Sequence, residues 1–175
     1  QRDAFLVHWL TQIAPNNIQK ETLPPEIRTM VQEFESRGIT LHILDVTALS
    51  IPSVSIAAIT AGAEIPQVVL SGASATTFAQ AIRDALREMV LMSAHVLYPG
   101  GAENSSGQAS ALAEPEPFVS DMNESTRQLF WRGPERIRQF QWFLSGKPVA
   151  YAELCQQDLT SAPDDDTQLA KCLER

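Results

Sequence analysis

Two acidic residues, Asp84 and Glu88, lie four positions apart in a segment with helical periodicity. At this spacing both carboxylates lie on one face of a helix, opposite its apolar stripe. Like charges so placed destabilise a helix by about 0.2–0.5 kcal/mol, and a hard cation would relieve the repulsion. Mg²⁺ is commonly held by one or two carboxylates together with substrate phosphates, so this face could present a nucleotide-bound metal. In the alternative, which the spacing alone favours, Arg83 and Arg87 neutralise the acids on a solvated surface.

A second set of candidates mixes arginine with aromatic residues in the C-terminal half of the chain. Arginine binds phosphate and carboxylate groups with two parallel hydrogen bonds, so a phosphate or peptide site is one interpretation. In the other, which we favour, the aromatic residues belong to the core and the arginines extend outward to pair with Glu124 and Glu135. The set consists of Arg127, Phe130, Trp131, Arg132, Arg136, Arg138, Phe140, Trp142 and Phe143.

The remaining candidates carry weaker signals. Ser71-Gly72 is expected between a strand and a helix, but no G-x-S-x-G or Walker pattern surrounds it, so a structural turn is the simpler interpretation. Asp45 and Thr47 would form a local side-chain turn at the end of a strand. Three histidines are scattered without the spacing of metal ligands, and the first two are interpreted as packed or edge residues. They are His8, His42 and His95.

Hydrophobic periodicity identifies the elements that must position these residues. It predicts helices near 2–13, 25–37 and 77–97, and Thr77 with Gln80 forms a candidate capping box in the last of them. Residues 39–72 contain only two charged side chains and are rich in Ile, Val and Thr, which is typical of buried strands. The strands are expected at 40–46, 54–60 and 67–71.

The expected fold is α+β (α/β-like), with a central, mostly β sheet from about 39–72 packed by these helices and a helical C-terminal part. In that part, helices are predicted at 121–131 and 135–144 and after the acidic run 164–166. Residues 99–117, rich in Pro, Gly, Ser, Ala and Glu, are predicted to be a flexible loop. The first helix begins with the chain and the last one runs to its end, so residues 1–175 are expected to be a partial domain, truncated at both ends.

Composition and charge exclude several classes of function. Lys and Arg number 13 against 21 Asp and Glu, a net charge of −8, which disfavours nucleic acid as a partner because its binding requires neutralisation of phosphates. No apolar run approaches the ~18 residues of a membrane span, so no membrane association is expected. The two cysteines, Cys155 and Cys172, form neither a zinc pattern nor a disulfide framework, as expected for a cytoplasmic protein.

Several of these segments, taken in order, resemble motifs of the YcaO superfamily. The first residues, Gln1-Arg2-Asp3-Ala4-Phe5, resemble a segment that closes an ATP-site motif. Residues 38–52, with Asp45-Val46-Thr47 and Ile51-Pro52, resemble the stretch G…l.D.T…iP.v. Ser71-Gly72-Ala73 and the following residues 81–88 resemble a glycine turn before Ai.rAl.E. The resemblance extends over about residues 1–97 and 137–175.

The resemblance implies an ATP- and Mg²⁺-dependent enzyme that phosphorylates the oxygen of a peptide backbone amide. A neighbouring Cys, Ser or Thr side chain then closes an azoline ring, and relatives make thioamides or amidines. The substrate would be a ribosomally made precursor peptide, and the partner a leader-binding protein related to ubiquitin-activating enzymes; the chain could also form a homodimer. Glu88 matches the metal-binding glutamate of the family's Q-x-x-x-E pattern, Asp84 stands at its first position, and Arg2 would face the nucleotide.

Two positions depart from the family pattern. Gln1 stands where the family carries a glutamate, and Asp84 stands where Gln or Glu is expected. The departures leave a second hypothesis open, a non-catalytic YcaO-like scaffold that docks a precursor peptide or a partner protein. A third is an α/β domain with an unrelated ligand at the end of its sheet. Because residues outside the chain would complete the nucleotide site, the 175 residues alone are predicted to have no ATPase activity.

Overall fold

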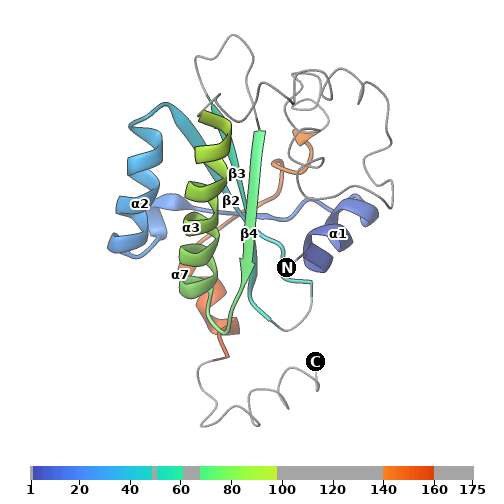
Figure 1. Cartoon of the computed structure of the whole chain (residues 1–175). Coiled ribbons are helices and arrows are strands. Elements are labelled where there is room, and N and C mark those ends of the chain that lie inside the picture. The colour runs from blue at the N-terminus through green and yellow to red at the C-terminus, as the bar shows by residue number, and fades with distance from the viewer. Residues whose placement is uncertain (1, 49–50, 61–67, 98–139, 160–175) are drawn as a thin grey trace.

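The computed structural model describes residues 2–48, 51–60, 68–97 and 140–159 (Figure 1). The chain begins with helix α1 (Arg2–Thr11), strand β1 (Asn16–Ile18), a short 3-10 helix η1 (Lys20–Thr22) and helix α2 (Pro25–Glu35). Three long strands follow, β2 (Ile39–Asp45), β3 (Ser53–Thr60) and β4 (Val68–Ser74), and then helix α3 (Phe78–Leu97). The last described part contains β5 (Pro148–Val149), helix α7 (Tyr151–Leu154) and the 3-10 helix η3 (Cys155–Gln157).

The strands form one sheet in the order β4-β3-β2-β1-β5. β2, β3 and β4 pair antiparallel along their length, β1 pairs antiparallel with β2, and β5 adds in parallel to β1. With its packed helices, this sheet is the α+β fold that the sequence predicts. β1 and β5 are not among the predicted strands, because they contain only three and two residues and show no alternating apolar pattern.

Helices α2 and α3 cover one face of the sheet. Alternate strand side chains point to that face, so Leu41 and Ile43 of β2 and Ile56 of β3 are almost fully buried there. They belong to the same apolar cluster as Val31 of α2 and Leu86 of α3. The periodicity of α2 and α3 therefore predicts correctly which of their faces is buried.

Helix α1 and residues 140–144 cover the opposite face, where aromatic rings form a second cluster. Trp9 lies at its centre, with ring centroids 6.0 Å from Phe140, 5.1 Å from Trp142 and 5.7 Å from Phe143. Figure 1 shows β4 between α3 and α1 because the two layers cover opposite faces. The core role expected for Phe140 and Phe143 is confirmed, since both are fully buried.

The helices predicted at 2–13, 25–37 and 77–97 agree with the structure to within two residues, and the difference at α1 has a local cause. Helix α1 ends at Thr11 because Gln12 adopts the left-handed conformation, with φ of 56°. The N–H of Gln12 then bonds to the carbonyl of Trp9 at 3.4 Å, and the N–H of Ile13 bonds to that of His8 at 3.2 Å. This pair of bonds is a Schellman motif, which ends the helix before Pro15.

Several predictions lie outside the described residues: the loop at 99–117, the helix at 121–131 and the helix after residues 164–166. The helix predicted at 135–144 is described only from Phe140 onward. There the chain makes tight turns, with the N–H of Phe143 bonded to the carbonyl of Phe140 at 3.0 Å.

The start of α3 is held by two side chains. Thr77 Oγ1 accepts the N–H of Gln80 at 3.1 Å, which is the first half of the predicted capping box. From the C-terminal part of the chain, Asp158 Oδ1 accepts the N–H of Phe78 at 2.8 Å, and the next residue, Leu159, donates its N–H to the carbonyl of Thr76 at 2.8 Å. These contacts tie the segment after η3 to the first turn of α3.

We therefore expect Asp158→Ala to destabilise the protein by about 1 kcal/mol, the usual effect of losing a side-chain cap. The carboxylate also lies at the positive end of the helix dipole, which adds to this contribution. Glu153→Ala, an exposed neighbour, is the matched control. Urea unfolding measures both variants, and equal midpoints for the two would contradict the capping role.

Candidate functional site

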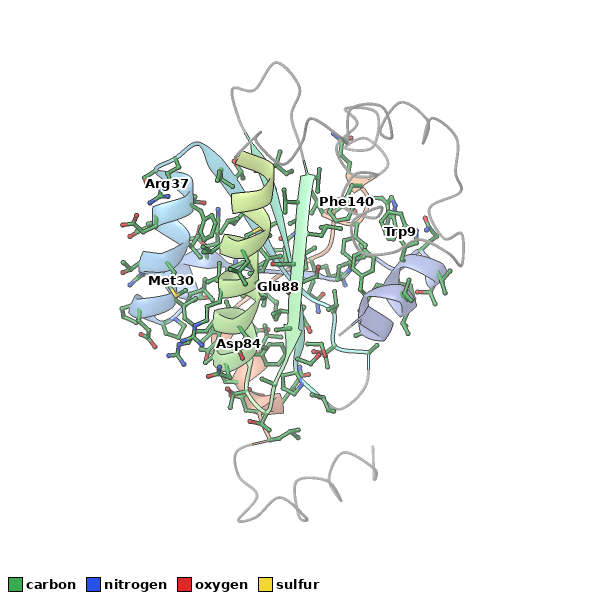
Figure 2. The ribbon with its side chains drawn as sticks, in the orientation of Figure 1. Trp9, Met30, Arg37, Asp84, Glu88 and Phe140 are labelled. Atoms are coloured by element: carbon green, nitrogen blue, oxygen red, sulfur yellow. The ribbon has the colours of Figure 1, made fainter. Side chains whose placement is uncertain are left out.

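The carboxylate of Glu88 points from α3 to the sheet. Its Oε2 accepts a hydrogen bond from the backbone N–H of Gly72 in β4 at 3.0 Å, and the residue is half-buried between the helix and the strand (Figure 2). The N–H of Ala75 bonds to the carbonyl of Pro52 at 3.1 Å, so odd-numbered residues of this strand face β3. The N–H of Gly72 therefore lies on the opposite, outer edge of the strand. Glu88 is thus fixed at one edge of the sheet.

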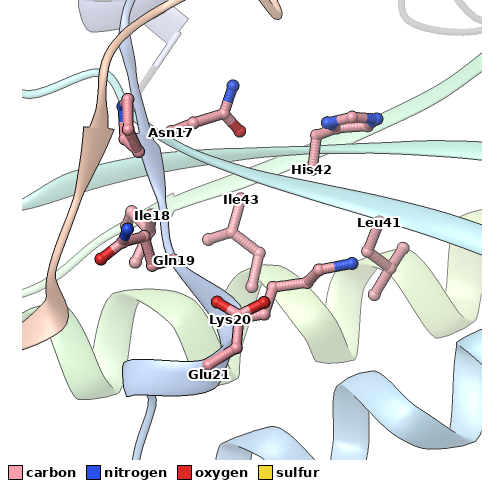
Figure 3. Close-up of a pocket in the computed structure, with 9 residues that line it drawn as sticks. Asn17, Ile18, Gln19, Lys20, Glu21, Leu41, His42 and Ile43 are labelled. Atoms are coloured by element: carbon pink, nitrogen blue, oxygen red, sulfur yellow. The ribbon is translucent and has the colours of Figure 1, made fainter.

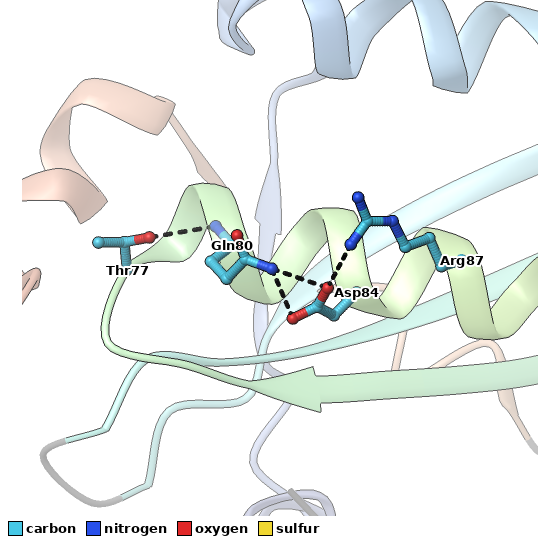
Figure 4. Close-up of polar contacts among 4 residues, drawn as sticks. All are labelled: Thr77, Gln80, Asp84 and Arg87. Carbon is cyan, nitrogen blue, oxygen red and sulfur yellow. Dashed lines mark hydrogen bonds and ion pairs between the residues drawn. The ribbon is translucent and has the colours of Figure 1, made fainter.

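The carboxylate of Asp84, one turn earlier, has local partners (Figure 4). Gln80 Nε2 lies 2.8 Å from each of its oxygens, and Arg87 Nη1 lies 3.1 Å from Oδ1. Its side chain is 40% exposed, so the ion pair with Arg87 is largely solvated. The two acids therefore have separate environments, in which Glu88 is bound to the sheet edge and Asp84 to its own helix.

The alternative in which Arg83 and Arg87 neutralise the acid pair on a solvated surface is correct for Arg87 but wrong for Arg83. Arg83 Nη2 lies 2.6 Å from Glu26 Oε1 of α2, because the two helices pack side by side and bring that carboxylate within reach. A backbone hydrogen bond accepted by the carboxylate of Glu26 lowers its pKa, and the guanidinium of Arg83 beside it lowers this pKa further. Arg83 thus joins α2 to α3 and does not neutralise the acid pair.

The structural turn expected at Ser71-Gly72 is wrong, because both residues lie inside β4, which continues to Ser74. Ser71 is 5% exposed, and its Oγ donates to the carbonyl of Ala85 at 2.9 Å. This hydroxyl is therefore a contact between strand and helix. By contrast, the side-chain turn expected at the end of β2 is confirmed, since the N–H of Thr47 donates to Asp45 Oδ1 at 3.0 Å.

A separate pocket of about 180 Å³ opens where β1 leaves β2 (Figure 3). Only Asn16 and Asn17 pair with β2, so the two strands separate beyond them. The half-buried His42 lines this pocket together with Lys20, whose ammonium pairs with Glu35. Burial lowers the pKa of His42, and the positive charge of Lys20 lowers it further. As predicted, His42 is a packed strand residue.

This shift gives a pH dependence of stability. The unfolded state takes up the His42 proton at an ordinary pKa of 6.5, but the folded state takes it up only at a lower pH. Stability is therefore full above about pH 6.5, falls as the pH drops toward the folded pKa, and levels off below it. We expect His42→Gln to lose less stability than the unmodified chain between about pH 7.5 and pH 5.5. Urea midpoints at the two pH values measure this, and equal losses would show that another group is responsible.

Other predicted residues are placed as follows. His8 Nδ1 lies 3.0 Å from the carbonyl of Ile13, so this histidine belongs to the end of α1. The side chains of Arg2 and His95, Cys172 and the arginine set lie outside what the structure describes. Within the described residues, no three His, Cys, Asp or Glu side chains gather closely enough to hold a metal ion. None of the helices described here is long and apolar enough to cross a membrane.

Two groups at the site are missed by sequence reasoning. The N–H of Gly72 is a backbone group whose position depends on strand register, and no residue type signals it. Gln80, which holds Asp84, stands at i−4 on the same helix, where such pairs form. That spacing was available from the sequence and could have identified it.

The family model described as YcaO cyclodehydratase, ATP- and Mg²⁺-binding, matches residues 1–175. A solved structure titled "Heterocyclase in complex with substrate and Cofactor" is similar over 87% of the chain, with 16% identity and a TM-score of 0.58. The heterocyclase TruD is similar over 98%, with 14% identity and a TM-score of 0.53. The chain covers 18% and 21% of these two proteins, about a fifth of their length. No curated protein matches the chain.

Proposed function

The chain belongs to the YcaO family, and we propose on this basis that it forms part of an ATP- and Mg²⁺-dependent cyclodehydratase. The proposed enzyme acts on a ribosomally made precursor peptide and converts Cys, Ser or Thr residues into azolines, or makes a related thioamide or amidine. The observation that supports it most is the family match over residues 1–175, together with a glutamate at the position of the family's metal ligand. The two heterocyclases support the fold.

Glu88 fits the proposed role of a magnesium ligand. Its Oε2 is oriented by the N–H of Gly72, so a carboxylate at this position has a fixed direction. Carboxylate oxygen is a preferred ligand of Mg²⁺, which is usually held by one or two carboxylates plus phosphate oxygens. Asp84 fits less well, because Arg87 already neutralises its charge. In this proposal Glu88 is the principal ligand, Asp84 assists only after leaving Arg87, and Arg2 binds the nucleotide.

Magnesium ATP would supply the phosphoryl group and neutralise its developing charge. The amide oxygen of the peptide takes this phosphoryl group, and ADP leaves. The adjacent thiol or hydroxyl would then attack the amide carbon and lose its proton. The amide oxygen would depart with phosphate, and the amide nitrogen would lose its proton as the C=N bond of the ring forms. The products are therefore one ADP, one phosphate and a peptide that has lost the elements of water. The part of Glu88 is electrostatic positioning, which dominates catalysis of phosphoryl transfer.

A second candidate is a non-catalytic scaffold that docks a precursor peptide or a partner protein. The pairing of Asp84 with Arg87 and Gln80 favours it, because a carboxylate engaged in this way is a poor metal ligand. The partner in either case is proposed to be a leader-binding protein related to ubiquitin-activating enzymes. We also propose that the protein acts in the cytoplasm and that it can form a homodimer.

Isotope transfer distinguishes these two functions. A protein that includes this chain is incubated with ATP, Mg²⁺ and a Cys-containing peptide whose backbone carbonyls carry ¹⁸O. The proposed enzyme transfers ¹⁸O to the released phosphate, and the peptide loses the elements of water. Phosphate without ¹⁸O, or a peptide of unchanged mass, would contradict a cyclodehydratase, and peptide binding without either product would support the scaffold.

A further inference from the structure

The outer edge of β4 carries backbone groups that face away from the sheet. Because the backbone N–H and carbonyl groups of Ala73 and Ala75 face β3, the N–H groups of Leu70, Gly72 and Ser74 point outward. Among contacts between residues that the structure describes, only the N–H of Gly72, of these three, has a partner, the carboxylate of Glu88. β4 is the terminal strand of the sheet order, and none of the strands described in the structure pairs with this edge. Figure 1 looks onto it, with β4 in front of β3 and β2.

The composition of β4 favours pairing at this edge. Proteins usually protect exposed edge strands with charged residues, proline or bulges. Val68–Ser74 has the sequence VVLSGAS, which contains no charge and no proline of its own, and it pairs with β3 in an unbroken register. The charged group that the structure places on this edge, Glu88, comes from α3. Its outward donors and acceptors repeat roughly every 7 Å, a spacing that matches the backbone of an extended polypeptide. The edge therefore suits a peptide strand better than a small ligand.

The reaction proposed above gives this edge an occupant. An enzyme that acts on backbone amides must bind its substrate through the backbone, and strand addition does so with little dependence on side chains. Glu88, the proposed metal ligand, is bonded to the middle of the same edge. We infer that an extended segment of the peptide substrate adds to the outer edge of β4 between Leu70 and Ser74. The identity of this peptide as the substrate rests on the proposed function.

Docking of the peptide also changes the position of Glu88. A carbonyl of the added strand takes the N–H of Gly72, which has one hydrogen to donate, so the carboxylate of Glu88 must leave it. The displaced carboxylate lies next to the docked backbone and regains the Oε2 lone pair that the N–H of Gly72 occupied, so a cation that already binds Glu88 gains a further ligand position. Peptide binding therefore favours cation binding at Glu88, and by linkage the cation favours the peptide equally.

Amide hydrogen exchange tests the docking site directly. The probes are a blocked heptapeptide of alternating Thr and Cys and the same peptide with N-methyl groups on two consecutive central residues, which block both of its edges. At saturation, the first peptide should slow exchange at Leu70, Gly72 and Ser74 by about tenfold, and the second should leave it unchanged. Equal effects of the two peptides, or unchanged exchange at all three residues with the first, would overturn the inference.

A pair of variants provides an independent test. Leu70→Pro removes one outward N–H and no hydrogen bond to β3, whereas Leu70→Ala shortens the side chain and keeps the N–H. The proline variant should weaken binding of the unmethylated peptide by about tenfold relative to the alanine variant, with both showing native circular dichroism. Equal affinities would overturn the inference. These experiments contain no nucleotide and no magnesium, so their failure leaves the isotope-transfer result untouched, and the reverse also holds.

Discussion

Replacing Gly146 with alanine should unfold a large part of the aromatic cluster that helix α1 and residues 140–144 form on one face of the sheet. An added Cβ would lie 1.6 Å from the carbonyl oxygen of Pro15 and 2.6 Å from its carbonyl carbon. Both atoms belong to the backbone, so no side-chain rotation relieves the overlap. Overpacking of this kind costs about 3 kcal/mol or more. That is a large share of the roughly 5–15 kcal/mol that stabilises a domain.

The effect should extend beyond the turn because this segment joins β1 to the C-terminal part. The N–H of Asn17 bonds to the carbonyl of Lys147 at 2.8 Å, and its side-chain Nδ2 bonds to the carbonyl of Leu144 at 2.6 Å. Moving residue 146 away from Pro15 should break both contacts and so loosen the attachment of residues 140–144 to β1. Thermal unfolding and tryptophan fluorescence measure the loss. Lys147→Ala is the control, and an equally small effect of both variants would show that the close approach does not exist.

Glu88→Gln should weaken the binding of Mg–ATP by about a hundredfold in a protein that includes this chain. The amide oxygen of glutamine can still accept the N–H of Gly72, so the fold is kept while the negative charge is lost. A neutral oxygen is a weaker ligand for a hard cation than a carboxylate oxygen. Isothermal titration with Mg–ATP measures the change, and urea unfolding checks that stability is retained.

Asp84→Asn is the matched control on the same helix. Because Arg87 already neutralises this carboxylate and Gln80 binds it, we expect the affinity for Mg–ATP to fall by less than about threefold. A larger loss for Asp84→Asn than for Glu88→Gln would assign the metal to the other carboxylate. Unchanged affinity for Mg–ATP in both variants would show that the metal ion does not bind at this face of α3.

The sequence predicts the long elements well because their patterns are strong. Residues 25–37 and 77–97 have continuous apolar stripes, and 39–72 has few charges, so α2, α3 and the three long strands are located within three residues. β1 and β5 could not be predicted in this way. They are too short to carry a pattern, and they are strands only because the chain brings them side by side.

The contacts of the candidate site also fall into two groups, those that the sequence predicts and those that it does not. The ion pair of Asp84 with Arg87 is local to one helix and follows from spacing. The contact of Arg83 with Glu26 joins two helices, and that of Glu88 with Gly72 joins a helix to a strand. Neither can be read from a single sequence, because crossing position and strand register decide which groups meet.

The central claim is that the carboxylate of Glu88 binds the divalent ion that accompanies the nucleotide. Mn²⁺ can replace Mg²⁺ in ATP, and its unpaired electrons broaden the NMR signals of nearby nuclei. In a ¹⁵N-labelled protein that includes this chain, Mn–ATP should broaden the amide signals of Gly72 and Glu88 strongly, and Mg–ATP should leave them sharp. If Mn–ATP binds while both signals stay sharp, the ion lies elsewhere and the claim is wrong.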